Sequence, residues 1–427
     1  MKTSILVLMA AASLPFAAMA ADKPAQPVTV IKAAHMIDTI AGKRRDNVMV
    51  VVRGDRIDKV GKAGDAIPDG AQVIDLGDKT IMPGLVDSHT HMTGAPFYGY
   101  EGLKVSVPRS ALYGAKNARI TLLAGITTVR DVGAEGFSDV ALRDAINDGD
   151  VPGPRMLVSG PALGMTGGHC DSNLLPYGYH HRAEAVADGP WAVRAKVREV
   201  IKYGANLIKF CATGGVLSKG DSPGAQQYSF EEMKAIVDEA HLHGRRVAAH
   251  AHGTDGIKTA IRAGVDSIEH ASILDDEAIK MAKAHGTYFS MDIYNDDYIL
   301  SEGMKNGMLP ESIEKERAIG LTQRQSFRRA YKAGVKMAFG TDEGVYPHGD
   351  NGKQMAKMVE WGMSPMVAIQ TATMGSATLL GMQNDIGAIT PGRFADIIAV
   401  DGNPLKDASE YTRVRFVMKG GEVYKGE

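Results

Sequence analysis

The sequence predicts an α/β protein in which a (β/α)8 TIM barrel carries a small β-sandwich domain formed from both chain ends. Two features of the chain support this fold class. Its central part alternates apolar, strand-like runs with helical patterns, which is typical of βαβ units and a parallel sheet. Its two ends contain short β-rich runs separated by turn residues, which are typical of an all-β unit.

The barrel is predicted from eight strand-like runs in the order that a TIM barrel requires. Helical patterns lie between or after them at Phe230–His243, Asp275–Ala284 and Ser364–Leu380, with Ser229 and Ser364 predicted as N-caps. The eight runs are Gly84–Ser88, Ile126–Asp131, Arg155–Gly160, Leu207–Ala212, Arg246–Ala251, Ser267–Ala271, Tyr288–Ile293 and Met337–Thr341.

The β domain is predicted from runs at both ends of the chain that share one pattern, in which short β-rich segments alternate with turn residues. Turn signals such as Arg53-Gly54-Asp55 and Lys419-Gly420-Gly421 separate these runs. The runs are Val28–Ile31, Val48–Val52, Arg56–Val60, Gln72–Leu76, Asp396–Val400, Arg413–Met418 and Glu422–Tyr424. We therefore expect residues 21–83 and 386–427 to form one sandwich, with the barrel domain, residues 84–385, inserted between them.

The first 20 residues predict a secretory signal peptide. Lys2 precedes an apolar run that ends at Phe16, and Ala18-Met19-Ala20 supplies a small-residue cleavage pattern. The run is much shorter than the roughly 20 apolar residues that span a bilayer, which disfavours a membrane anchor. We expect an exported protein, periplasmic or secreted, with no membrane association after cleavage.

Charge and cysteine content narrow the possible partners. The formal net charge of -2, with both signs interspersed, gives no basic stripe for nucleic acid, so a small molecule is the expected partner. The two cysteines, Cys170 and Cys211, exclude a disulfide scaffold. A bridge between them is possible, but the sequence favours two buried free thiols near the site.

Six ionisable residues predict a metal site on one rim of the barrel. In His89-Thr90-His91 the two imidazoles lie two residues apart on a strand and therefore point to the same face. Lys209, His250, His270 and Asp342 lie at or near the carboxyl ends of other strands, where TIM-barrel active sites are built. Taken singly, each could be a core histidine, a capping aspartate or a snorkelling lysine. Together, four His, one Asp and one Lys favour a divalent metal.

The segment from Pro83 to His91, with Ile208-Lys209, His250, Ser267-Ile268-Glu269-His270 and Gly340-Thr341-Asp342, resembles the amidohydrolase superfamily. Within it, the chain resembles the imidazolonepropionase-like metal-dependent carboxypeptidases and Xaa-Pro dipeptidases, and most closely the bacterial amidohydrolases that hydrolyse ochratoxin A. This resemblance implies cleavage of a C-terminal amide, as in the conversion of ochratoxin A to ochratoxin alpha and phenylalanine.

The resemblance also implies a binuclear centre with two divalent ions, zinc by default, although manganese, cobalt or nickel would suit the same ligands. His89, His91 and Asp342 would bind one ion and His250 and His270 the other. Lys209, carboxylated by CO2, would bridge both. Asp342 would accept a proton from the nucleophile and pass it to the leaving amine. Relatives are commonly homo-oligomers, sometimes octamers.

Three further residues are expected to contact the substrate. His252 lies two positions after His250 and is predicted to face the substrate carbonyl or carboxylate, unless it faces solvent. His169, in a glycine-rich loop, is a candidate oxyanion or substrate contact. Tyr228 resembles the tyrosine that binds the substrate carboxylate in related dipeptidases.

Two alternatives remain open at the level of sequence. A deaminase of the same superfamily would usually keep one metal and generally lacks a lysine at the position of Lys209. A catalytically inactive barrel that only binds a ligand would be expected to have lost some of the six ligands, yet all are present. Loop shapes that select the substrate cannot be derived from the sequence.

Overall fold

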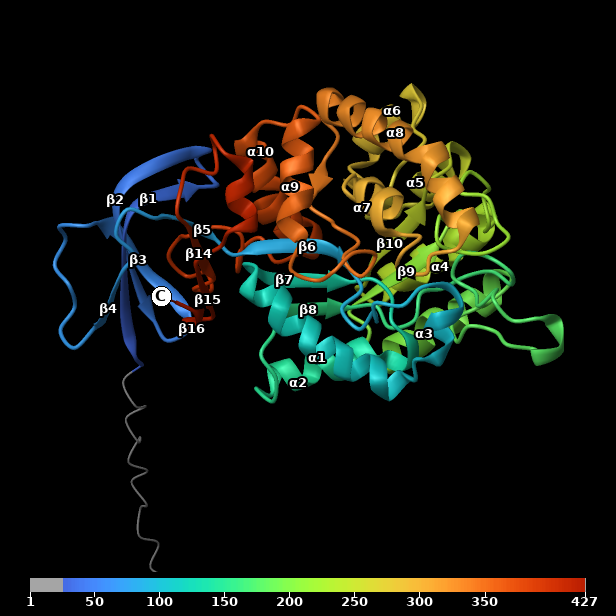
Figure 1. The fold of residues 1–427 in the computed structure, drawn as a ribbon, viewed down its shortest axis with the longest axis horizontal. Coiled ribbons are helices and arrows are strands. Elements are labelled where there is room, and N and C mark those ends of the chain that lie inside the picture. The colour runs from blue at the N-terminus through green and yellow to red at the C-terminus, as the bar shows by residue number, and fades with distance from the viewer. Residues whose placement is uncertain (1–25, 427) are drawn as a thin grey trace, which may run out of the picture.

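The structure is a computed structural model that describes residues 26–426. The predicted signal peptide therefore lies outside the described residues. Within that range, no helix combines the length and apolar character needed to cross a bilayer. Figure 1 shows a β-rich region beside a larger region in which helices surround strands.

Both ends of the chain contribute to one eight-stranded sheet, as predicted. Its order is β16-β15-β14-β5-β1-β2-β3, with β4 paired to β1. The C-terminal strands join the N-terminal ones where β14 pairs antiparallel with β5, placing Ile398 opposite Met82. The strands are β1 (Val28–Asp38), β2 (Lys43–Arg53), β3 (Arg56–Lys62), β4 (Gln72–Asp75), β5 (Thr80–Pro83), β14 (Ile397–Val400), β15 (Phe416–Lys419) and β16 (Glu422–Lys425).

This sheet folds over on itself in the manner of a sandwich. Ile57 of β3 and Phe416 and Met418 of β15 belong to one buried apolar cluster, although their strands lie far apart in the sheet order. The amide of Ile57 also donates to the carbonyl of Arg393, just before β14. Residues from both termini thus close a separate small core beside the barrel (Figure 1).

All eight predicted barrel strands are present and run parallel in two sheets, β6-β7-β8 and β9 to β13. Main-chain hydrogen bonds join the sheets at both edges, from Ser88 N to Phe339 O and from Asn206 N to Val158 O, each 2.7 Å. The strands are β6 (Leu85–Thr90), β7 (Ile126–Asp131), β8 (Arg155–Val158), β9 (Leu207–Cys211), β10 (Arg246–Ala251), β11 (Ser267–His270), β12 (Tyr288–Ser290) and β13 (Met337–Ala338).

Alternation along these strands separates packing from chemistry. Ile208 and Phe210 of β9 lie in the main apolar core, and Lys209 between them points to the other face and lines a cavity. In β10, Val247 and Ala249 likewise pack in the core while His250 lines the cavity.

The helices pack around the strands, and two predicted N-caps are confirmed. Ser229 forms a capping box with Glu232, and the Ser364 hydroxyl accepts from Val367 N. The helices are α1 (Val107–Leu123), α2 (Ser138–Asn147), α3 (Pro190–Lys202), α4 (Phe230–Leu242), α5 (Thr254–Ala263), α6 (Asp276–His285), α7 (Asn295–Glu302), α8 (Pro310–Ala333), α9 (Asn351–Glu360), α10 (Pro365–Gln370) and α11 (Ser376–Leu380).

The single helix predicted over Ser364–Leu380 is interrupted by a π-helical turn, Thr371–Gly375. The Thr371 hydroxyl donates to Ala368 O at 2.7 Å, and the Thr373 hydroxyl donates to Ile369 O at 2.6 Å. These side chains compete for carbonyls that the α-helical ladder would otherwise use, which accounts for the break.

Candidate active site

The structure brings all six predicted metal ligands to one cavity of about 870 Å³. His89 lies near the end of β6 and His250 near the end of β10, so parallel strands deliver both to the same rim. Their neighbours on that rim come from other strand ends. The six residues are His89, His91, Lys209, His250, His270 and Asp342.

Two groups of side chains have geometry suited to an ion, and His270 belongs to both. The first comprises His250, His252 and His270, and the second comprises His89, His270 and Asp342; within each group the ligand atoms lie within 4.8 Å of one another. This grouping adds His252, which the sequence analysis assigned to substrate. His91 approaches from the side, with Nε2 3.1 Å from Asp342 Oδ1.

The imidazoles of the site are oriented by contacts to one ring nitrogen. In four of them Nδ1 lies within hydrogen-bond distance of a neighbouring oxygen, which leaves Nε2 available for an ion or a substrate in three of the four, while Nε2 of His91 faces Asp342. Such contacts fix the tautomer and the ring plane of metal-binding histidines. The contacts are His91 to Gly133 O (3.0 Å), His169 to Ser218 Oγ (2.7 Å), His252 to Ser272 Oγ (2.8 Å) and His270 to Asp292 Oδ1 (2.9 Å). This donor set fits divalent metal binding.

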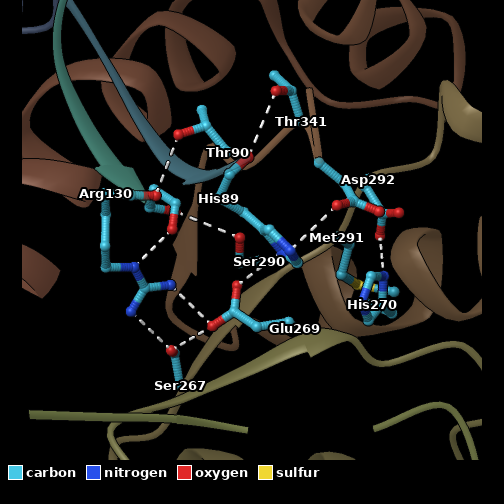
Figure 2. A network of polar contacts seen from close by, with 12 residues as sticks. His89, Thr90, Arg130, Ser267, Glu269, His270, Ser290, Met291, Asp292 and Thr341 are labelled. Atoms are coloured by element: carbon cyan, nitrogen blue, oxygen red, sulfur yellow. Dashed lines mark hydrogen bonds and ion pairs between the residues drawn. The ribbon is translucent and has the colours of Figure 1, made fainter. Parts of the chain in front are cut away.

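A buried charged network holds His89 from below (Figure 2). Glu269 Oε2 lies 3.1 Å from His89 Nδ1, and Glu269 Oε1 accepts from Arg130 Nη2 at 2.7 Å. Arg130 also donates to the Ser267 hydroxyl at 3.0 Å. The sequence analysis did not assign a role to Glu269 or Arg130. Glu269 directly precedes His270, so alternation of side chains along β11 predicts that the two point to opposite faces of the strand. This signal could have drawn attention to Glu269.

Asp292 orients His270 in the same way and was also missed. Its Oδ1 lies 2.9 Å from His270 Nδ1 and accepts from Gln323 Nε2, also at 2.9 Å, while Asn295 Nδ2 donates to its Oδ2 at 2.6 Å. Asp292 follows β12 by two residues. The strand-end criterion that identified Asp342 would have found Asp292 too.

Electrostatics favour the neutral form of two of these imidazoles and the charged form of a third. Burial, followed by the neighbouring imidazoles, holds the pKa values of His250 and His252 well below their usual range. At His89, burial and the charge of Lys209 lower the pKa, but the carboxylates of Asp342 and Glu269 outweigh them and raise it to about 9. The neutral nitrogens of His250 and His252 are ready to bind a divalent ion, whereas His89 would release a proton to the solvent on binding one.

Lys209 is the unusual cation of the site. Its side chain is only 4% exposed, and it makes no side-chain hydrogen bond or ion pair with any residue in the range 26–426. Burial lowers the pKa of its amine, although the charges of Glu269 and Asp342 oppose this. A buried, unpaired amine is costly as an ammonium ion, so burial shifts the equilibrium of this amine towards its neutral form.

Left-handed backbone at the strand ends aims two ligands into the cavity. His270, Ala271 and Asp342 have φ values of 71°, 48° and 55°. Such conformations are uncommon outside glycine and tend to gather at functional sites. The left-handed backbone at His270 and Ala271 also explains why β11 ends at His270, one residue earlier than predicted.

His169 reaches the site from the loop after β8, as expected. Its ring stacks on His250 with centroids 4.1 Å apart and lines the cavity. A Cβ atom at Gly215 would lie 2.1 Å from His169 Cε1, so only glycine at position 215 leaves room for this ring. The prediction that His169 is a substrate contact is compatible with this position.

Cys170 and Cys211 form a disulfide, which corrects the expectation of two free thiols. The loop containing Leu163 runs alongside β9, with Leu163 N donating to Lys209 O at 2.8 Å and Cys211 N donating to Leu163 O at 2.9 Å. This pairing helps to bring the two Cα atoms to 5.9 Å, a separation that a disulfide spans. The bridge lines the cavity next to His169.

Tyr228 does not reach the cavity, which corrects its expected role in binding the substrate carboxylate. The side chain is fully buried in the main core, and its hydroxyl donates to Ala187 O at 2.9 Å. The loop position that suggested a substrate contact instead directs the ring inward, beside Phe210.

Comparison with known proteins identifies the family. The model of the amidohydrolase family matches residues 80–426. The chain belongs to the amidohydrolase family. An ochratoxinase from Aspergillus niger is 37% identical over 370 residues, covering 81% of this amidohydrolase and 76% of the relative.

Solved structures support the same assignment and the fold. A Xaa-Pro dipeptidase with methionine bound in its active site superposes on this amidohydrolase with a TM-score of 0.88 at 38% identity, covering 93% of this chain and 100% of that one. The structure of Aspergillus niger ochratoxinase gives a TM-score of 0.85 at 33% identity, covering 94% and 96%. The amidohydrolase is therefore a TIM-barrel hydrolase that acts on amide bonds.

Proposed function

We propose that this amidohydrolase is a binuclear-metal enzyme that removes the C-terminal amino acid from an acyl or peptidyl amide. One observation carries the proposal: two groups of side chains with metal-binding geometry lie side by side, and Lys209 lines the cavity they face. One imidazole nitrogen binds one ion, so His270 can complete only one group, and the ligand atoms left in the other, His89 and Asp342 with His91 beside them, suit a second ion.

Lys209 is proposed to become the ligand that joins the two ions. The nitrogen of its neutral amine would bond to the carbon of CO2 and release one proton, giving a carbamate whose single negative charge is shared by two oxygens. The buried, unpaired state of the amine and its lowered pKa support this modification. The change replaces a costly buried cation with an anion suited to divalent metals, for which zinc is the default.

When bound, two such ions supply a water of lowered pKa and polarise the scissile carbonyl. Asp342 would accept the proton of the attacking water and transfer it to the leaving amine. Asn295 Nδ2 holds Asp342 by donating to Oδ2 at 3.1 Å, while Oδ1 faces His89 and His91. His169 would contact the substrate from the adjacent cavity wall, and His252 would either do so or serve as a metal ligand.

The substrate class is proposed from the relatives. Ochratoxinase and Xaa-Pro dipeptidase are among the proteins most similar to this chain, which supports amides with a free C-terminal amino acid. Hydrolysis of ochratoxin A to ochratoxin alpha and phenylalanine is one candidate reaction, with dipeptides and N-acyl amino acids as the others.

Export and self-association belong to the same proposal. A disulfide beside the active site supports an oxidising compartment, periplasmic or extracellular, because cytosolic thiols are kept reduced. We also propose a homo-oligomer, with an octamer as one candidate form; light scattering of the purified protein would reveal a monomer if this is wrong.

The test is metal analysis by plasma mass spectrometry beside a hydrolysis assay on ochratoxin A, dipeptides and N-acyl amino acids. We expect about two ions per chain and release of a free amino acid. A Lys209→Ala variant should lose most of the activity and the bound metal. One ion per chain with ammonia released from a heterocycle would instead indicate a deaminase, and absence of both metal and turnover would indicate a binding protein.

A further inference from the structure

Glu316 is a buried acid that the proposed reaction does not use. It lies on α8 and is 4% exposed, and it lines the same cavity as the metal ligands. Its carboxyl group makes no hydrogen bond or ion pair with any residue in the range 26–426. A buried carboxyl that faces a cavity without a protein partner is available to a ligand.

The other acids around Glu316 already have partners. Asp296 pairs with Arg324 at 2.9 Å, and Asp292 is held by His270 and by two side-chain amides. The neighbouring cation on α8, Lys315, is directed away and bonds to Asp221 at 2.8 Å. Of these three acids, Glu316 is therefore the one whose negative charge has no compensating partner.

The carboxyl groups of Asp296 and Glu316 lie close together at the inner face of α8. A Cβ atom at Gly320 would lie 2.3 Å from Asp296 Oδ1 and 3.0 Å from Glu316 Oε1, so both carboxyl groups lie over this glycine. Burial, followed by the charges of Asp296 and Asp292, raises the pKa of Glu316 to about 8. A positive group placed in the cavity would relieve this repulsion.

The residues near Glu316 suit a cationic group that is attached to an alkyl chain. Ile313 and Ile319 of α8 belong to one apolar cluster with Val216, Ile299 and Val345, and the last three line the cavity. Alkyl groups can pack on such a wall while a charged end reaches a carboxylate.

Glu316 lies at a distance suited to substrate recognition rather than to the chemical step. Gln323, which contacts Asp292 beneath the metal ligands, lies seven residues further along the same helix. Seven residues correspond to two turns, so the two residues share a face of the helix and their Cα atoms are separated by roughly 10 Å along its axis.

We propose that Glu316 binds an organic cation of the substrate, either the free α-ammonium group of a peptide or a basic side chain. The inference rests on the proposed function, because the cation is carried by the amide that the metal centre hydrolyses. It predicts a preference for cationic substrates over neutral N-acyl compounds of equal size.

The experiment compares kcat and KM for matched substrates in the metal-loaded enzyme. Leucyl-phenylalanine against N-acetyl-leucyl-phenylalanine tests the α-ammonium group, and N-acetyl-lysyl-phenylalanine against N-acetyl-norleucyl-phenylalanine tests a basic side chain. Glu316→Gln removes the charge at nearly constant volume. Glu314→Gln is the control, because it removes a carboxylate from the exposed side of the same helix, where Glu314 pairs with Arg317.

We expect wild type to prefer the cationic member of one pair, and Glu316→Gln to raise its KM about tenfold with little change in kcat. The neutral substrates should be unaffected by Glu316→Gln, and both classes by Glu314→Gln. The pair that responds identifies the source of the cation. Equal losses on neutral and cationic substrates, or no loss on either, would overturn the proposal.

A binding measurement separates this inference from the proposed function. Calorimetric titration with n-pentylammonium and n-pentanol should show that wild type and Glu314→Gln bind the amine more tightly, while Glu316→Gln does not discriminate. If no amide is hydrolysed but the amine still binds through Glu316, the proposed reaction is wrong and the cation site stands. Equal affinity of wild type for amine and alcohol would refute the cation site, whatever the activity.

Discussion

Removing the disulfide should lower the stability of the protein by a predictable amount. The bridge joins cysteines that are 41 positions apart. In the loop-closure treatment, a crosslink of this span restricts the unfolded chain by about 4 kcal/mol. The double variant Cys170→Ala/Cys211→Ala should therefore have a free energy of unfolding about 4 kcal/mol lower than that of wild type.

The assay is equilibrium unfolding in urea, followed by the fluorescence of Trp191 and Trp361 at fixed metal concentration, because bound metal also stabilises the folded state. Wild type with added reductant should approach the midpoint of the double variant. The double variant itself should not respond to reductant, which controls for effects of the reagent on the metal.

The same change should affect the site, because Cys170 follows His169 directly and His169 stacks on His250. We expect KM to rise in the double variant. Two titratable thiols in the native, unreduced protein, together with a midpoint that reductant does not move, would refute the reasoning.

Three further outcomes follow from buried polar contacts. Arg130→Met should destabilise the fold by about 3–5 kcal/mol in urea unfolding, because Glu269 keeps a buried charge without its partner; an unchanged midpoint would contradict the network. A hydrogen bond from Arg198 lowers the pKa of Glu239 to about 2 against the effect of burial, so its contribution is complete above about pH 4.5 and disappears as the pH falls towards 2. Glu239→Gln should thus destabilise at pH 7 and much less at pH 3, and an equal loss at both would argue against this pairing. Tyr228→Phe should cost about 1 kcal/mol of stability and leave KM unchanged, whereas a raised KM would restore its substrate role.

The fold was largely predictable because its signals are local. Each barrel strand is a short apolar run whose alternate residues must be buried, and Ile208 and Phe210 on either side of Lys209 display that pattern in the sequence itself. The π-helical turn after α10 was not predictable in this way, since it depends on where threonine hydroxyls find carbonyls in the folded chain.

The location of a site residue could be predicted where its position on a strand determines it. It could not be predicted where the path of a loop determines it. All six expected ligands line one cavity, because strand ends converge by symmetry of the barrel. Tyr228 and the disulfide depend on the paths of long loops, which no periodicity encodes. Glu316 was invisible for another reason: a carboxylate on a long helix is usually a solvated charge, and only the packing of α8 shows that this one faces inward.

The pairing of β14 with β5 ties the metal centre to the order of synthesis. β5 leads through Gly84 into β6, the strand that carries His89, and β5 pairs with the early strand β1 on one side and with β14, which is translated only after the entire barrel, on the other. A nascent chain can thus assemble most of its helices while one edge of β5 still lacks its partner. Premature termination a few dozen residues from the end would spare every proposed ligand and still leave that edge of β5 open, so messages truncated late should yield protein in which the strand that leads to His89 is less firmly held.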